Sequence, residues 1–370
     1  MAISIAASAA AAVVLLGALG ATSPPDTATT EPTSSTSPAS ARPASELDTG
    51  DGYSVVGAIA ELPARVLEDD RYLLSTANLE AAAEQAGLPS DDGDGLTVLT
   101  GDPRTRHGEA PPMFVQRPDW MLLAMDDPGR MREQVGWDLA DVDAFAAISR
   151  PPPNGFTVVA GDFDDVLPES LRPLAPGVVT LGEGDDGEQH LGHPTALSYV
   201  GTPQRLAADD HRLAFGPLLD DVVAWEDDGA QRAVATDDLG VLAVANALDD
   251  AGAVSAVVAG MPRGEASAIS VPIDVVGIGF AADDGRAVIT VAYHVVEGGD
   301  HEQARGEIRS AFTTALSAAP GPPQSELVSV IDVVATGDAV VATLTVPAGE
   351  SPGMMLSLLE LEAAPFVAPP

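Results

Sequence analysis

The chain has 370 residues, of which 17 are basic and 56 are acidic, so its formal net charge at pH 7 is −39. All the basic residues are Arg, and since nucleic acids and anionic lipids are bound through cations that neutralise phosphates, this balance argues against both as partners. The absence of Lys and Cys excludes Schiff-base and thiol nucleophiles, thiolate metal sites and disulfides.

Residues 1–21 carry no charged side chain, and residues 9–19 form an apolar stretch typical of a secretory signal. Small residues at Ala18 and Gly20 would permit cleavage before Ala21. The apolar stretch has no basic residue before it, which leaves open a retained N-terminal membrane anchor, because ~21 helical residues span roughly 30 Å. We therefore expect an exported protein, extracellular or in the cell envelope, with membrane contact only through this segment.

Residues 22–52 are rich in Ser, Thr, Pro and Ala and have no apolar periodicity, which predicts a disordered linker. Such a segment acts either as a tether that holds a folded body away from a membrane or wall, or as a simple spacer. Thr22 stands where a bacterial lipoprotein would need Cys, so the usual lipid anchor is not expected.

A strand followed by a capped helix is predicted at residues 72–75 and 78–87, with Asn78 as the cap and Gly87 as the stop. The pattern returns at residues 156–167, where Asp162 takes the position of Asn78, and more loosely at residues 212–225. These copies predict an N-terminal α+β domain over residues 53–262 that is built from duplicated strand–helix units.

Between the first two copies, residues 120–125 read as a buried strand or the start of a helix. Residues 138–148 predict a helix, because Leu139, Val142, Phe145 and Ile148 recur at helical spacing, and three prolines at 151–153 would end it. A further helix is predicted at 238–250 and a buried strand at 254–258.

Residues 263–366 predict a second α+β domain, with the boundary placed in the Pro- and Gly-containing stretch 261–268. Its pattern is two strands, a helix, and a hairpin closed by a Gly-containing turn, which makes a ββαββ antiparallel sheet with a helix layer. The segments that make up this domain are strands at 274–280 and 287–295, a helix at 301–318, strands at 327–334 and 339–346, and a short helix at 354–362.

The one local cluster of metal-ligating residue types is formed by His190 and His193 together with Asp185 and Asp186. Two His three residues apart beside carboxylates could bind a divalent cation, although a solvated Gly-rich loop explains the same pattern. No cofactor is predicted, because Gly277-Ile278-Gly279 runs into an acidic turn where a dinucleotide site would begin a helix.

The common catalytic signatures are missing from the sequence, including the nucleophile elbow, the zinc-protease helix motif and the phosphate-binding loop. Acidic runs such as 91–95 and Asp162, Asp164 and Asp165 could supply paired carboxylates for hydrolysis, but such runs also arise from the acidic composition alone. The missing signatures favour a protein that is not an enzyme.

The leader, the stalk and two stretches of the body, 135–143 and 156–165, resemble uncharacterised exported proteins of high-GC Gram-positive bacteria. The resemblance implies an envelope location more than an activity, and the missing lipoprotein Cys departs from many members. Our first hypothesis is a non-catalytic binding or scaffold module on a stalk, with a cell-wall or envelope partner. The alternatives are an extracytoplasmic hydrolase that uses Asp or Glu and a divalent-cation binder; the oligomeric state is not predicted.

Overall fold

The computed structural model describes residues 47, 52–67, 71–88, 99, 110–150, 155–163, 166–209, 211–226, 233–261, 267–315 and 328–367. These residues all belong to one compact unit, Arg42–Pro370. The predicted leader, nearly all of the predicted linker, the acidic run 91–95 and the prolines at 151–153 lie outside the described residues.

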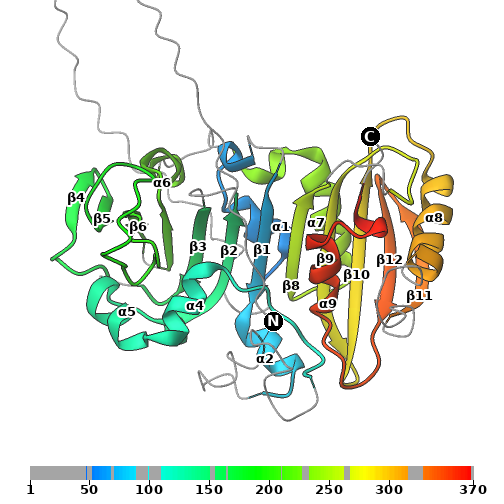
Figure 1. The fold of residues 1–370 in the computed structure, drawn as a ribbon, viewed down its shortest axis with the longest axis horizontal. Helices are drawn as coiled ribbons and strands as arrows, with labels where there is room; N and C mark the ends of the chain where they lie inside the picture. The colour runs from blue at the N-terminus through cyan, green and yellow to red at the C-terminus, as the bar shows by residue number, and fades with distance from the viewer. Residues whose placement is uncertain are drawn as a thin grey trace, which may run out of the picture. The chain divides into compact units, whose positions relative to one another are not determined.

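A sheet of twelve strands runs through this unit in the order β11-β12-β10-β9-β8-β1-β2-β3-β7-β6-β5-β4 (Figure 1). The pairings between neighbouring strands are antiparallel. The predicted α+β class is thus confirmed as a mixed fold with a large antiparallel sheet. The strands are β1 (Leu73–Asn78), β2 (Val142–Ser149), β3 (Gly155–Gly161), β4 (Arg172–Ala175), β5 (Val178–Leu181), β6 (Gln204–Ala208), β7 (Arg212–Gly216), β8 (Ser255–Gly260), β9 (Ile273–Asp283), β10 (Arg286–Val295), β11 (Ser329–Thr336) and β12 (Ala339–Thr345).

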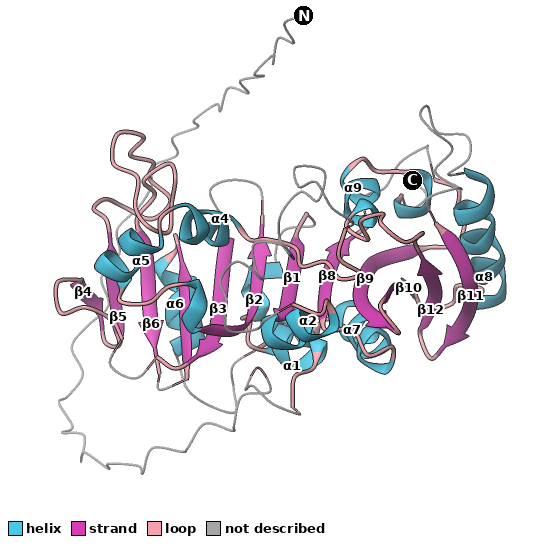
Figure 2. Cartoon of the chain, turned by 90° about the horizontal axis from the view of Figure 1, so that it is seen from below, coloured by secondary structure: helices cyan, strands magenta, loops and turns pink. Residues whose placement is uncertain are grey.

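Helices cover both faces of the sheet (Figure 2). One face carries α4 (Asp119–Asp126), α5 (Pro128–Val135), α8 (His301–Ser310) and α9 (Met354–Glu360). The other carries α1 (Val55–Ala60), α6 (Leu219–Glu226) and α7 (Leu239–Asp250). Helix α2 (Leu79–Gln85) packs against β1, β2 and β9. None of the helices in the described ranges has the length and apolar character needed to cross a bilayer.

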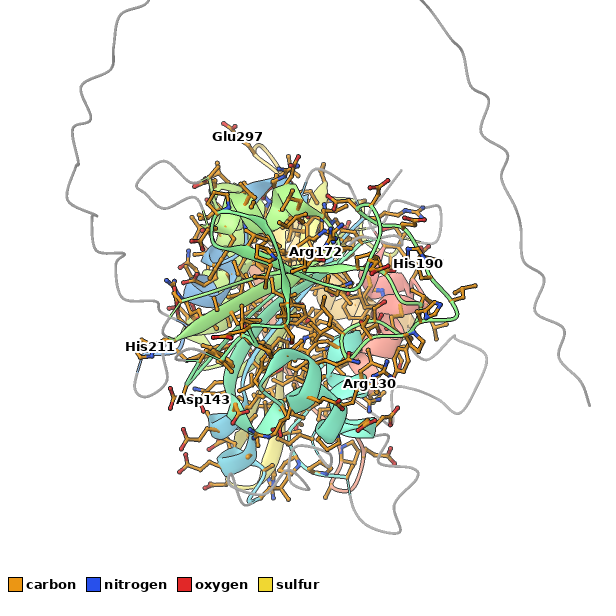
Figure 3. All side chains as sticks on the ribbon, turned by 90° about the vertical axis from the view of Figure 1, so that its left-hand side faces the viewer. Arg130, Asp143, Arg172, His190, His211 and Glu297 are labelled. Carbon is orange, nitrogen blue, oxygen red and sulfur yellow. The ribbon has the colours of Figure 1, made fainter. Side chains whose placement is uncertain are left out.

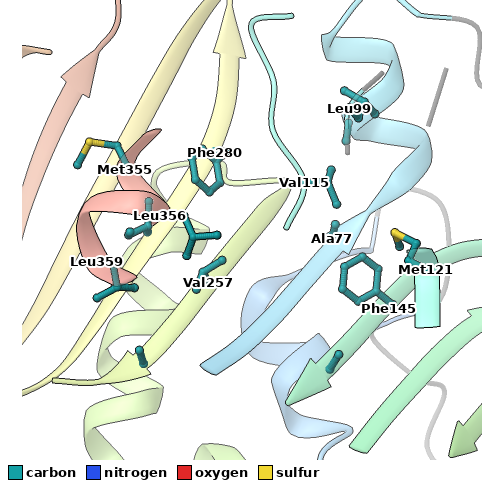
Figure 4. Packing of buried hydrophobic residues seen from close by; sticks show 14 of the residues in the cluster. Ala77, Leu99, Val115, Met121, Phe145, Val257, Phe280, Met355, Leu356 and Leu359 are labelled. Atoms are coloured by element: carbon teal, nitrogen blue, oxygen red, sulfur yellow. The ribbon is translucent and has the colours of Figure 1, made fainter. Parts of the chain in front are cut away.

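Each face of the sheet has its own hydrophobic core, because successive residues of a strand point to opposite faces. Phe145 of β2 lies in the core under α4, beside Met121 (Figure 4), whereas the adjacent Ala144 and Ala146 belong to the core under α1. The first core continues under α9, where Leu356 lies near Phe280 of β9. The central strands are therefore buried on both faces.

Local signals place several elements where the sequence predicts them. The Asn78 side chain accepts a hydrogen bond from the Ala81 N–H at 2.9 Å and so caps α2. Asp238 caps α7 in the same way through the Val241 N–H at 3.0 Å. The third predicted copy is confirmed as β7 followed by α6, but in the second copy the described residues after β3, 162–163 and 166–167, are not helical.

The predicted helix over residues 138–148 is wrong. Residues Leu139–Asp141 form one 3-10 turn capped by Asp138, and the chain then enters strand β2. The alternation of a strand is hidden in the sequence because β2 is buried on both faces, so that Phe145, Ala146, Ala147 and Ile148 are all apolar. The helical spacing of Leu139, Val142 and Phe145 does not mark a helix face, because Leu139 lies in the 3-10 turn and the other two lie in strand β2.

The sheet is continuous across the predicted domain boundary at 262/263. Strand β8 lies before this boundary and β9 after it, and the two strands pair directly, with Val257 opposite Ile278. Close packing of α7 explains the glycines at this point. A Cβ on Gly277 would lie 2.3 Å from Val244 Cγ1, and one on Gly279 would lie 3.0 Å from Leu248 Cδ2, both in α7. These glycines let the helix approach the sheet.

Candidate ligand cavity

The loop of residues 182–203, which joins β5 to β6, contains all four residues predicted as metal ligands. The carboxylate of Asp186 is engaged by the protein, because Oδ1 accepts from Arg205 Nε at 2.9 Å and Oδ2 accepts from the Leu219 N–H at 2.7 Å. Asp186 thus ties the loop to β6 and to the start of α6.

The other predicted ligands do not converge with Asp186. His190 Nε2 lies 3.5 Å from Glu188 Oε2, and the same Glu188 oxygen accepts from the Asp185 N–H at 3.1 Å. His193 is exposed, and its backbone N–H donates to the His190 carbonyl at 2.7 Å. Within the described ranges, no group of three or more His, Asp or Glu side chains could hold a metal ion. The metal site stays an untested prediction without a defined ligand set.

Arg205 holds the base of the loop. Its side chain is buried, with 3% exposure, and besides Asp186 it binds Thr180 Oγ1 at 2.6 Å and the Gly184 carbonyl at 3.0 Å. Hydrogen bonds from a charged donor are stronger than neutral ones, and all three guanidinium nitrogens are used. The loop therefore has a defined conformation at its start.

The far part of the loop docks on helices α4 and α5. The Ala196 N–H donates to Gln134 Oε1 at 2.8 Å, Arg130 Nη2 donates to the Pro194 carbonyl, and the Tyr199 hydroxyl donates to Asp126 Oδ2 at 3.3 Å. In Figure 3, Arg130 and His190 lie on the same side of the view, opposite His211. The loop thus covers the face of the sheet that carries α4 and α5.

Beneath this loop lies a cavity of about 450 Å³. Its floor is formed by strands β2, β3 and β7, and its walls by α4 and residues 197–202 of the loop. The floor includes Ala147, Thr157 and Phe215, and the walls include Trp120, Leu197 and Tyr199. An apolar, partly aromatic lining with a few polar groups is typical of small-molecule sites.

The register of the sheet explains why space is left at this point. One row across β2, β3 and β7 places Phe145 opposite Val159 and Val159 opposite Leu213, and these side chains fill the core. Two residues further along β2 the row begins with Ala147, which lies opposite Thr157. The next pair on this face is Ser149 and Gly155. On β2 and β3 the side chains therefore become smaller toward this end of the strands, while Phe215 of β7, opposite Thr157, closes the far side of the floor.

Two charged residues, Asp119 and Arg150, are among the described lining residues. Arg150 Nη2 donates to Asp221 Oδ2 at 2.7 Å, and Asp221 also pairs with Arg65 at 3.1 Å, so the Arg150 charge is compensated within the protein. Asp119 is exposed in the first turn of α4 and forms no ion pair with any residue that the structure describes. Among the described lining residues, the charged side chain without an ion-pair partner is therefore an acid.

Tyr199 lies at the wall of the cavity with 49% of its surface exposed. Partial desolvation, the Asp126 carboxylate and, more weakly, Asp119 raise the pKa of Tyr199 above its ordinary value, while Arg117 acts in the opposite direction. The phenol is thus held in its neutral form, as the donor to Asp126. It contributes an aromatic ring and no charge to the site.

No family model and no curated protein sequence matches the chain. Among solved structures, two crystal forms of a protein named TP0453 are similar, each with a TM-score of 0.36. Crystal form I has 7% sequence identity and covers 81% of this chain and 97% of that chain. Crystal form III has 6% identity and covers 80% and 97%, respectively.

Sequence reasoning missed the cavity. Trp120 falls in the stretch 120–125, which the sequence predicts as a buried strand or the start of a helix; it is buried, with 3% exposure, but it also forms a cavity wall. Ala147 was placed in a helix that does not form. The one sequence feature that pointed to the cavity was the small residues near the end of the 142–149 segment. This feature indicates a cavity only when the segment is known to be a strand and its pairing register is known.

Proposed function

We propose that this chain is an exported cell-envelope protein that binds a small ligand in the cavity and performs no chemistry on it. The cavity carries this proposal, because small side chains on β2 and β3 leave space in front of aromatic and apolar lining residues, and a small ligand can occupy that space. The apolar leader at residues 1–21 supports export, and the composition of residues 22–52 supports a flexible tether.

A binding role is favoured over hydrolysis by the charges at the cavity. Glycoside hydrolysis uses two carboxyl groups that flank the bond to be broken. Asp119 is the one carboxylate among the described lining residues, and the nearby Asp126 is bonded to Tyr199. This arrangement offers one exposed carboxylate and no partner for it in the lining.

We propose that the two predicted domains have different roles. The described lining residues fall between Pro118 and Pro217, so the cavity belongs to the part predicted as residues 53–262. We propose that residues 263–366 extend the sheet and provide surface for a wall or envelope partner.

Titration with Nile red, a neutral and largely apolar dye, tests the binding role. Ser149→Trp adds bulk at the exposed end of the cavity floor, while Ser329→Trp places the same side chain on an exposed end of β11. We expect saturable dye fluorescence from the parent, at least tenfold weaker binding to Ser149→Trp, and unchanged binding to Ser329→Trp. Binding that is not saturable, or equal for both variants, would contradict the proposal.

Export is tested separately. Residues 1–60 fused to a reporter that is active only outside the cytoplasm should give signal, since the apolar leader and stalk are then sufficient for translocation. A silent reporter with normal expression would contradict export and leave the binding role unaffected.

A further inference from the structure

The electrostatic character of the cavity narrows the class of ligand, if the proposed binding function holds. Asp119 lines the cavity, is exposed and has no ion-pair partner among the described residues, whereas the lining cation Arg150 is bonded to Asp221. Arg117 lies near enough to Tyr199 to influence its pKa, but it is not among the described lining residues. Among the described lining residues, an anionic ligand would therefore meet the unpaired carboxylate of Asp119, while the one lining cation, Arg150, is already bonded to Asp221.

The aromatic rings of the lining also favour a cationic ligand. Trp120 and Phe215 line the cavity but are each only 3% exposed and pack edge to face, with ring centroids 5.9 Å apart, so they contribute apolar surface. Tyr199 at the wall is 49% exposed and is the ring that a cation can reach. The π face of an aromatic ring attracts a cation, most strongly when the cation is partly desolvated. Apolar surface, aromatic rings and one free carboxylate together favour an organic cation over a neutral or anionic molecule.

We infer that the ligand carries an ammonium or guanidinium group joined to an apolar body. The apolar body lies on the floor against Ala147 and Phe215. The cationic group lies near Asp119 and Tyr199, where it gains both the carboxylate and an aromatic ring. The net charge of −39 further raises the local concentration of organic cations.

The test uses three probes that share a naphthyl body: (2-naphthylmethyl)trimethylammonium, 2-naphthylmethanol and 2-naphthylacetate. Calorimetric titration of the full chain at physiological salt should give at least tenfold tighter binding of the ammonium probe than of the alcohol, with the carboxylate weakest. Asp119→Asn should weaken the ammonium probe at least fivefold and leave the alcohol within twofold.

Glu297→Gln is the matched control, because Glu297 is an exposed carboxylate in the turn after β10 and lies far from Arg130 and His190 in Figure 3. It removes the same charge without altering the cavity, so it should leave all three affinities unchanged. Equal effects of the two variants would overturn the role of Asp119, because the preference would then come from the diffuse charge of the protein.

The outcomes separate this inference from the function on which it rests. Equal or tighter binding of the alcohol or the carboxylate, abolished by Ser149→Trp, would overturn the cation preference and uphold the binding role. Failure of all three probes and of Nile red to bind saturably would overturn both.

Discussion

Arg205 donates from Nε to Asp186 Oδ1 at 2.9 Å, while Oδ2 of the same carboxylate accepts the Leu219 N–H at 2.7 Å. One acidic side chain thus joins the loop over the cavity to β6 and to helix α6. This relationship makes the loop a structural wall of the cavity and gives the Asp186 carboxylate a structural role.

Replacing Arg205 by Met should destabilise the protein and weaken ligand binding together. The change removes three hydrogen bonds from a buried guanidinium, and we expect a loss of about 2 to 4 kcal/mol in the free energy of unfolding. Urea unfolding and dye titration measure the two effects. Arg172→Met, at an exposed position of β4, is the control and should change neither by more than about 0.5 kcal/mol.

Gly→Ala substitutions at two positions should change the stability of the protein in opposite directions. Gly277→Ala places a Cβ 2.3 Å from Val244 Cγ1, so α7 or β9 must shift, at a cost of about 1 to 3 kcal/mol. Gly306→Ala lies inside α8, where nothing stands within 4 Å of the new Cβ, and should stabilise by about 0.5 to 1 kcal/mol. Equal effects in thermal unfolding would contradict the close packing of α7.

Asp209 should make stability depend on pH. Desolvation tends to raise the pKa of Asp209, but hydrogen bonds from Arg212, with Nη2 at 2.6 Å, and from two backbone N–H groups lower it below its ordinary value of 3.8. A carboxyl whose pKa is lowered by folding contributes stability above its ordinary pKa, and this contribution is lost as pH falls through the folded value.

Asp209→Asn should therefore be less stable than the parent by about 2 kcal/mol at neutral pH, because it loses the charged bond to Arg212. The difference should shrink as the pH falls from 3.8 through the lower pKa of the folded state, where the carboxyl of the folded parent also becomes neutral. Urea unfolding at several pH values measures it. A constant difference across the acid range would show that Asp209 acts only through packing.

Salt should stabilise the chain. With 56 acidic residues against 17 basic ones, surface repulsion opposes folding, and added monovalent salt shortens its range from ~8 Å at physiological ionic strength. The melting temperature should rise with NaCl, and Ca²⁺ or Zn²⁺ at constant ionic strength should add nothing further. A saturating extra rise that is lost in His193→Ala would instead support the predicted metal site.

Short-range signals in the sequence were sufficient to predict the positions of several helices and strands. Asp238 predicts the start of α7, and the turn at Thr336-Gly337-Asp338 predicts the hairpin of β11 and β12, because capping and turn chemistry act within a few residues. Strand β2 was missed because both faces of it are buried, which removes the polar alternation that identifies a strand.

The candidate site depends on long-range relationships that no local pattern contains. The space above Ala147 exists because β2 pairs with β3 in a register that places Thr157 opposite it. The loop wall depends on Arg205, which lies 19 residues from Asp186 in the sequence.

The central claim, that the cavity holds a ligand, is tested most directly by ¹⁹F NMR of protein labelled with 5-fluorotryptophan. The chain has three Trp residues, and Trp120 lines the cavity whereas Trp225 lies in the core on the opposite face of the sheet. Trp→Phe variants assign the signals. During titration with the naphthyl ammonium probe, the Trp120 signal should shift to saturation while the Trp225 signal stays in place. Saturable binding that leaves the Trp120 signal unmoved, or moves both signals equally, would contradict the claim.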